Sequence, residues 1–163
     1  ADRTTGQFLG AEAAGAGETD KIIDVAVTAL TLKGNVNDLD NMDMAYAPPF
    51  STAIHPFVTA IQVLKNKLDG TIDSMTPEEY LEGAAEGYQI IDASMSPAIE
   101  GAPYVDPTEV NGALDGYGTD EKLLLVCTKG KRAYLLQNRL KYYGYTNTKV
   151  LEAGTSFNDV KAV

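Results

Sequence analysis

The single cysteine, Cys127, is the residue of this sequence with the clearest capacity for covalent chemistry. It follows the apolar run LLLV and precedes the loop TKGK, which leads into the helical pattern KRAYLLQNRLKYY. Sulfur at the end of a buried strand faces a loop whose backbone N–H groups can converge on it, and the next helix directs the positive end of its dipole there. Lys129, Lys131 and Arg132 add positive charge. All these effects favour thiolate over thiol, so we predict a reactive cysteine.

Gly130 gives this loop the freedom to bend without placing a Cβ in the anion site. Two simpler interpretations stay open. A lone cysteine after an apolar strand is often an inert core residue, and a basic loop with a glycine is also an ordinary strand-to-helix turn. The cysteine, the loop and the helix occur together here, and this combination favours chemistry.

The charge distribution indicates a small anionic ligand. The chain of 163 residues has a formal net charge of -10, which argues against nucleic acid as a general partner because phosphate binding needs a basic surface. Residues 122–149 nevertheless contain no Asp or Glu, and their basic residues are Lys122, Lys129, Lys131, Arg132, Arg139, Lys141 and Lys149. A local positive field in an acidic protein favours a small anion. A helix with a solvated basic face is the alternative.

Composition and the first residues bear on the compartment. One cysteine cannot form a disulfide within the chain, which fits a reducing cytosol. The start ADRTTGQFLG does not have the basic and then apolar pattern of a secretory signal, and no apolar run is long enough to span a bilayer. We therefore expect a cytoplasmic protein with no membrane partner and no metal site.

The second half of the chain alternates strand and helix patterns. Thr76, Pro77 and Glu79 form the signature of a helix start with a capping box. Strands are predicted at YQIIDAS (88–94), LLLVC (123–127) and TKVLEAG (148–154), and helices at PTEVNGAL (107–114) and KRAYLLQNRLKYY (131–143). This alternation predicts βα units around a small parallel sheet, and thus an α/β fold.

The first half predicts fewer strands. Residues 6–16, rich in glycine and small side chains, suggest a β-hairpin or strand pair. A helix is expected from Thr19, as its N-cap, to Gly34, and a second helix from about Pro56 to Gly70. The intervening loop contains Pro48 and Pro49, which oppose helix formation, and residues 70–75 form a polar joint.

Several segments of the second half resemble rhodanese-like sulfurtransferases. VCTKGKRA (126–133) is similar to their active-site loop, in which a cysteine, four loop residues and a basic residue precede a helix. YQIIDAS, IEGAPYVDPTEV and GYTNTKVLEAG are similar to the first core strand, the Ile-x-Gly-Ala segment and the Gly-Gly ending of that family. The resemblance covers residues 88–160.

The resemblance implies that Cys127 carries sulfane sulfur as a persulfide. The amides that would cradle this sulfur belong to Thr128, Lys129, Gly130, Lys131, Arg132 and Ala133. The basic side chains among them would attract an anionic sulfur donor. Ser94 stands where the family usually has Arg, and the stretch from Asp92 to Ile99 is shorter than usual, which affects donor specificity.

Two alternatives to a sulfurtransferase remain. A non-catalytic module for docking or dimerisation is the alternative from another class, although inactive relatives commonly lose the cysteine. A cysteine phosphatase is a weaker alternative, because its loop places five residues between Cys and Arg, whereas four separate Cys127 from Arg132.

Residues 2–68 resemble the end of the dimerisation domain of pyridine nucleotide-disulfide oxidoreductases, in the coenzyme A-disulfide reductase and NADH oxidase branch. DMAYAPPFSTA (43–53) is the most specific part. Some of these flavoenzymes carry a rhodanese-like domain in this order. We therefore expect a partial dimerisation domain (1–70), a linker and helix (71–87) and a rhodanese-like domain (88–163).

This second resemblance implies roles outside the sulfur site. Tyr46 would lie at a homodimer interface formed by residues 1–70 and reach the coenzyme A site of the partner subunit, or simply pack on the adjacent prolines. His55, the only histidine, is interpreted as structural. The chain contains neither a dinucleotide-binding glycine motif nor a flavin-linked cysteine. We therefore expect a C-terminal piece that binds no cofactor itself, within an intact protein that uses FAD, NAD(P)H and coenzyme A.

Overall fold

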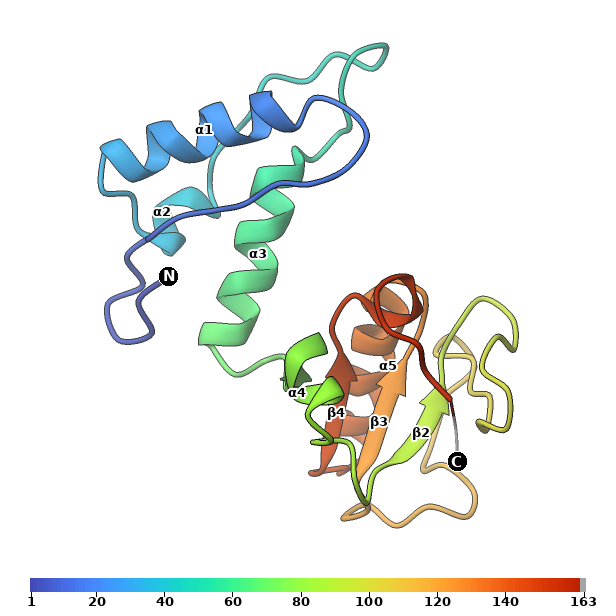
Figure 1. Ribbon diagram of the computed structural model, residues 1–163. Coiled ribbons are helices and arrows are strands. Elements are labelled where there is room, and N and C mark those ends of the chain that lie inside the picture. The colour runs from blue at the N-terminus through green and yellow to red at the C-terminus, as the bar shows by residue number, and fades with distance from the viewer. Residues whose placement is uncertain (162–163) are drawn as a thin grey trace. The chain divides into compact units, whose positions relative to one another are not determined.

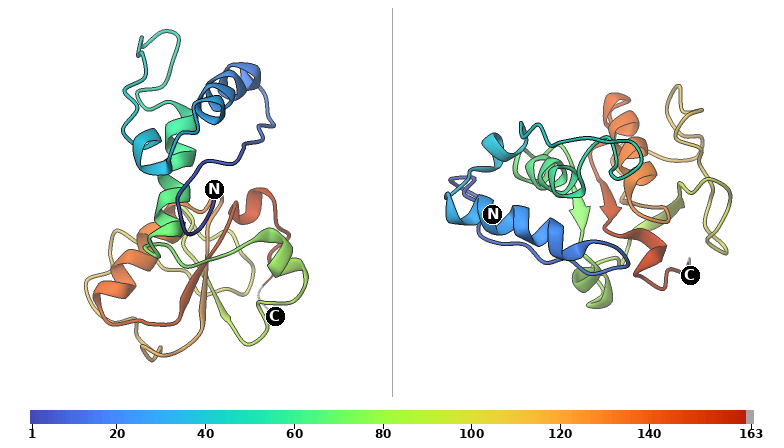
Figure 2. Two further views of the ribbon diagram at one scale, coloured as in Figure 1. Left: turned by 90° about the vertical axis from the view of Figure 1, so that its left-hand side faces the viewer. Right: turned by 90° about the horizontal axis from the view of Figure 1, so that it is seen from above.

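The computed structural model describes residues 1–161, which form two compact units (Figures 1 and 2). The first unit spans residues 1–71, and the second begins at Ile72. Residues 71–87, the expected linker and helix, contribute a strand and a helix to the second unit. No helix within the described residues is long and apolar enough to cross a bilayer.

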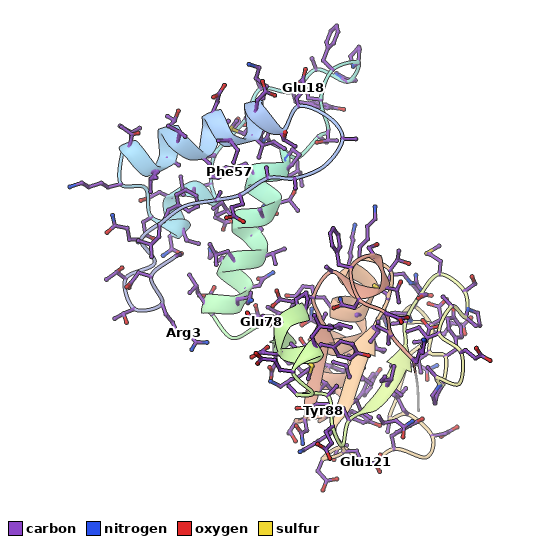
Figure 3. All side chains as sticks on the ribbon, viewed as in Figure 1. Arg3, Glu18, Phe57, Glu78, Tyr88 and Glu121 are labelled. Atoms are coloured by element: carbon purple, nitrogen blue, oxygen red, sulfur yellow. The ribbon has the colours of Figure 1, made fainter. Side chains whose placement is uncertain are left out.

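The first unit is built from helices α1 (Thr19–Thr31), α2 (Val36–Leu39) and α3 (Pro56–Leu68), which Figure 2 shows from two sides. Phe57 of α3, labelled in Figure 3, meets Phe8 edge to face at a centroid distance of 5.7 Å. The buried apolar residues of this unit are Phe8, Ala26, Ala29, Val36, Leu39, Phe57, Val58 and Ile61, and all but Val58 form one cluster. Eight residues make a small core for three helices.

The strand pair predicted for residues 6–16 is wrong. A single bridge between Gln7 and Asn35 forms, and the Phe8 amide donates to the carbonyl of Gly34 at 3.0 Å. Phe8 is the one residue between positions 6 and 16 that enters the core. Leu9 is 61% exposed, and residues 10–16 are mostly small, so a ladder gains too little from burial to offset its ordering entropy.

Both long helices of this unit were predicted, and their ends differ in detail. Thr19 is the first residue of α1 rather than its cap, and Glu18 occupies the cap position without a side-chain bond. The helix ends at Thr31, and the Gly34 amide then returns to the Ala29 carbonyl at 2.8 Å. The Nδ1 atom of His55 accepts the Phe57 amide at 3.2 Å, which caps α3. His55 therefore has a structural role.

The second unit contains a four-stranded parallel sheet in the order β1-β4-β3-β2, so the α/β fold with a small parallel sheet is confirmed. In Figure 1 the arrows of β2, β3 and β4 point the same way. The elements are β1 (Ser74–Met75), α4 (Pro77–Leu81), β2 (Gln89–Asp92), β3 (Leu123–Val126), α5 (Lys131–Tyr142), β4 (Thr148–Leu151) and the 3-10 helix η1 (Gly154–Ser156).

Alternation along β3 divides the core of this unit into two layers. Leu123 and Leu125 pack with Leu136 and Leu140 of α5 on one face of the sheet. Leu124 and Val126 pack on the other face, with a cluster that includes Met75, Ile99 and Leu151. Every residue of β3 is fully buried, as a continuous apolar run in a parallel sheet predicts.

Two predicted segments of this unit are corrected. Residues 70–75 are not only a polar joint, because Ser74 and Met75 pair with Val150 and Leu151 along the free edge of β4. The helix expected at 107–114 is absent, and turns stand in its place. Asp106 accepts both the amide and the hydroxyl of Thr108 at 2.8 Å, but the turn that begins there does not continue into a helix. The capping box at Thr76 and Glu79 is confirmed.

Candidate active site at the end of β3

Cys127 is the first residue after β3 and is only 3% exposed. Strand β3 lies between β4 and β2, and all three are parallel, so their carboxyl ends meet at one edge of the sheet. Cys127 is therefore flanked by the segments that follow β2 and β4. The carboxyl edge of a parallel sheet is where α/β proteins place their ligand sites.

The loop after Cys127 brings an amide to the sulfur, as predicted. The Gly130 N–H donates to the Sγ atom of Cys127 at 3.2 Å. Gly130 has a φ of 91°, a left-handed conformation that side chains disfavour, and it directly precedes α5. The sulfur thus lies beside the N-terminus of α5, whose first amides have no partner within the helix and favour a negative charge.

The segment after β4 holds this loop, a contact that the sequence did not reveal. The amides of Thr155 and Ser156 donate to the carbonyls of Cys127 and Thr128, each at 3.0 Å. In a trans peptide the C=O and N–H point in opposite directions, so the amides of Thr128 and Lys129 point away from η1. Two of the six predicted cradle amides are oriented by these bonds.

Gly154 makes that close approach possible. A Cβ at this position would lie 1.7 Å from the Cys127 carbonyl oxygen, so no other residue fits without moving the loop. Ala153 before it has a φ of 60°, which is unusual for a residue with a side chain.

The basic residues of the loop have different surroundings. Lys129 and Lys131 are exposed to solvent beside the loop. Arg132 is partly buried: its Nε donates to the Ala93 carbonyl at 2.9 Å and its Nη2 to the Asp106 carboxylate at 3.0 Å. The two lysines are therefore placed to attract anions from solvent, whereas Arg132 is engaged within the protein. Ala133, the last predicted cradle residue, is buried in the core.

The shortened stretch after β2 is organised around Asp92. The buried carboxylate accepts the amides of Ser94 at 2.9 Å, Ala98 at 2.6 Å and Ile99 at 3.0 Å. Burial alone raises the pKa of Asp92, but these hydrogen bonds outweigh it and hold the pKa below its usual value. Ser94 is buried beside it. The Ala93 amide donates to the Val126 carbonyl at 2.7 Å, which places this stretch next to Cys127.

Tyr46 belongs to the first unit, in the segment between α2 and α3, and is 54% exposed. Among residues 1–161, no group of three or more His, Cys, Asp or Glu side chains is arranged to hold a metal ion. The arrangement around Cys127 thus consists of one thiol, backbone amides, a helix N-terminus and two exposed lysines.

Comparison with known proteins finds two solved structures that are similar to most of this chain. No family model and no curated protein matches the sequence. Among solved structures, an NAD-dependent persulfide reductase from A. fulgidus matches 88% of this chain at 32% identity with a TM-score of 0.75. Reduced CoADR-RHD from Bacillus anthracis matches 86% of this chain at 25% identity, also with a TM-score of 0.75. The chain spans about a quarter, 26%, of each of these proteins.

A rhodanese-like domain protein from Staphylococcus aureus also matches, over 53% of this chain and 90% of its own length, at 21% identity with a TM-score of 0.43. The two longer matches extend across most of both units. They agree with the α/β fold and with the resemblances in VCTKGKRA and DMAYAPPFSTA. By these two comparisons the chain is similar to part of a persulfide reductase and to part of CoADR-RHD, which is consistent with a coenzyme A-disulfide reductase-like sequence that carries a rhodanese-like domain.

Proposed function

We propose that the second unit is a sulfurtransferase domain in which Cys127 carries sulfane sulfur as a persulfide. The observation that carries this proposal is the buried Sγ atom, 3.2 Å from the Gly130 amide at the start of α5. An anionic sulfur placed there gains a hydrogen bond and the favourable end of the helix dipole. The persulfide reductase activity in the name of the A. fulgidus protein supports the same chemistry.

The first step loads the sulfur. The Cys127 thiolate attacks the outer sulfur of a donor such as thiosulfate, a new S–S bond forms, and the S–S bond of the donor breaks. Sulfite leaves with the electron pair of that bond. Lys129 and Lys131, exposed beside the loop, attract the anionic donor, and the amide of Gly130 stabilises the charged sulfur.

The second step returns the thiolate. The thiolate of a low-molecular-weight acceptor attacks the terminal sulfur of the persulfide, and the bond between that sulfur and Cys127 breaks. The acceptor leaves as a persulfide, and Cys127 regains its electron pair. Because Cys127 begins and ends as a thiolate, the cycle needs no oxidant or reductant.

We extend the proposal to the longer protein that the comparisons suggest. There the acceptor thiol would be coenzyme A, reduced in turn by an FAD- and NAD(P)H-dependent part, and residues 1–70 would form a homodimer with Tyr46 near the coenzyme A site. The exposed apolar side chains of the first unit that support such an interface are Val27, Leu30, Leu32, Tyr46 and Val63. Ile22 and Val25 do not belong to this surface, because they pack against the core of the unit.

Mass spectrometry of the intact chain tests the sulfur step. Thiosulfate or a polysulfide should add one sulfur atom, which cyanide or a small thiol removes. Cys127→Ser should load nothing, because its hydroxyl cannot hold a persulfide. If the native chain stays unmodified and Cys127 alkylates more slowly than a free thiol, the cysteine is a packing residue and the docking-module alternative is favoured.

Light scattering tests the homodimer. The chain should self-associate, because the apolar surface of the first unit favours contact with a second copy. A monomeric mass over a wide concentration range would contradict the dimer, and a change from Leu32, 76% exposed, to Glu should weaken association without affecting sulfur loading.

A further inference from the structure

The guanidinium of Arg132 connects three separate segments next to Cys127. Its Nε donates to the carbonyl of Ala93, which follows β2, and its Nη2 donates to Asp106. Arg132 itself is the second residue of α5. The side chains of Arg132 and Asp106 are 20% and 25% exposed, so the pair is largely shielded from solvent.

Asp106 is held rigidly in place by its own neighbours. The amide and the hydroxyl of Thr108 both donate to its Oδ1 atom at 2.8 Å. These bonds, together with Arg132, hold the pKa of Asp106 below its usual value, so the carboxylate is charged at neutral pH. The preceding residues are anchored to the sheet edge, because the Val105 amide donates to the Asp92 carbonyl at 2.9 Å.

The pair changes how much positive charge the site presents. The loop carries Lys129, Lys131 and Arg132, and an unpaired Arg132 would make three cations near the thiol. With Asp106 at 3.0 Å, the charge of Arg132 is cancelled locally, and the two exposed lysines are left to attract an anion. The negative charge of Asp106 therefore reduces the positive charge near the thiol, because it neutralises Arg132.

We propose that Asp106 is a positioning residue that sets the preference of Cys127 for anionic reactants, by holding the Arg132 guanidinium against Ala93 and neutralising its charge. This inference rests on the proposed function, because it takes Cys127 to react with anions from solvent. It assigns donor selectivity to a carboxylate outside the cysteine loop. A donor with two negative charges is then favoured less than the basic sequence of the loop suggests.

Alkylation of Cys127 by iodoacetate and by iodoacetamide measures this preference directly. In both reactions the thiolate forms a C–S bond and iodide leaves with the electron pair, and the reagents differ in charge. Asp106→Asn keeps an oxygen acceptor for Arg132 but removes the negative charge. We expect the ratio of the iodoacetate rate to the iodoacetamide rate to rise about fivefold, the effect of unmasking one partly exposed charge.

Glu109→Gln is the matched control, because it removes one negative charge from an exposed side chain in the same segment. Its ratio should change less than twofold. An unchanged ratio in Asp106→Asn, or an equal rise in both variants, would overturn the inference. Asp106→Glu, which retains the charge, should stay near the native ratio, and a rise there would show that only the packing matters.

A double variant that keeps Asp106 in place covers the case in which Asp106→Asn is unstable. With Arg132 neutralised, the double change Lys129→Gln and Lys131→Gln should lower the ratio clearly below its native value. A ratio that stays at the native value would mean that the two lysines are not the cations that attract the anion, and would contradict the role of Asp106. Alkylation does not require sulfur transfer. Failure of sulfur loading with a shifted ratio would therefore reject the proposed function alone.

Discussion

The two units differ in how completely they bury their apolar residues. The second unit encloses a sheet whose central strand β3 is fully buried, and α5 covers one face of it. The first unit has a core of eight buried apolar residues and leaves Leu32, Val27 and Val63 exposed. A precisely shaped loop needs a rigid support, and the Cys127 loop lies on the unit with the closed core.

Because the two cores differ in this way, we expect the two units to unfold independently. The substitution with the largest expected effect, Phe57→Ala, tests this. Phe57→Ala removes an aromatic side chain from the small core of the first unit, at a cost of about 3–5 kcal/mol. The first unit should unfold, while Cys127 keeps its alkylation rate. Hydrogen exchange of the intact chain would follow both units, and loss of protection in β3 would refute their independence.

Within the second unit, the contact between Gly154 and the Cys127 loop should be the most sensitive. Gly154→Ala forces a Cβ onto the Cys127 carbonyl, so we expect a loss of about 3 kcal/mol and a large drop in the reactivity of Cys127. Thermal unfolding and alkylation rates measure the two effects.

Gly144→Ala separates the clash from the backbone cost. Gly144 has a φ of 90° and no atom within 4 Å of a built Cβ, so its substitution should cost about 1–2 kcal/mol and leave Cys127 unchanged. Equal effects of the two substitutions would remove the special role of Gly154.

Asp92 supports the other flank of the site, and its removal should have a smaller effect. In Asp92 one carboxylate oxygen accepts the amides of Ala98 and Ile99, and the other accepts the amide of Ser94. Asp92→Asn replaces one of these two acceptor oxygens with an NH2 donor, so at least one amide loses its partner. We expect a loss of about 2–3 kcal/mol in the free energy of unfolding. The Glu100→Gln change, on an exposed side chain nearby, should cost little.

The pH dependence follows from the lowered pKa of Asp92. The folded state holds the carboxylate charged more strongly than the unfolded state does, so its stabilisation is fully present above the usual carboxyl pKa. This stabilisation is lost as the pH falls below that value and through the lower folded pKa. In Asp92→Asn this acid-dependent loss should be smaller. An unchanged acid unfolding curve would argue against the network.

The two units also show which elements of secondary structure can be predicted from the sequence. The run LLLV and the capping box at Thr76 and Glu79 act through neighbours in the chain, so strand β3 and helix α4 were predictable. Strand β1 has two residues, and its partner β4 is remote in sequence, so no local pattern indicates it. The segment 107–114 carries a helix-start pattern, but the structure has turns there instead of a helix.

The same division holds for the candidate site. The cysteine, Gly130 and the start of α5 form one continuous segment, and their arrangement follows from the order of residue types. Gly154 and Asp106 reach the loop only through the fold, across the sheet edge. The sequence therefore predicts the nucleophile and its loop, whereas the residues that hold the loop require the topology of the sheet.

Ala153 provides the smallest test, on the strained segment that holds the loop. Its φ of 60° places a side chain in the left-handed region, which costs about 1 kcal/mol relative to glycine. Ala153→Gly should therefore stabilise the second unit by up to about 1 kcal/mol, reduced by the greater entropy of glycine in the unfolded chain. Thermal unfolding measures the change. Cys127 should keep its alkylation rate, because the bonds from Thr155 and Ser156 remain. A fall in that rate would show that Ala153 itself tightens the contact between η1 and the cysteine loop.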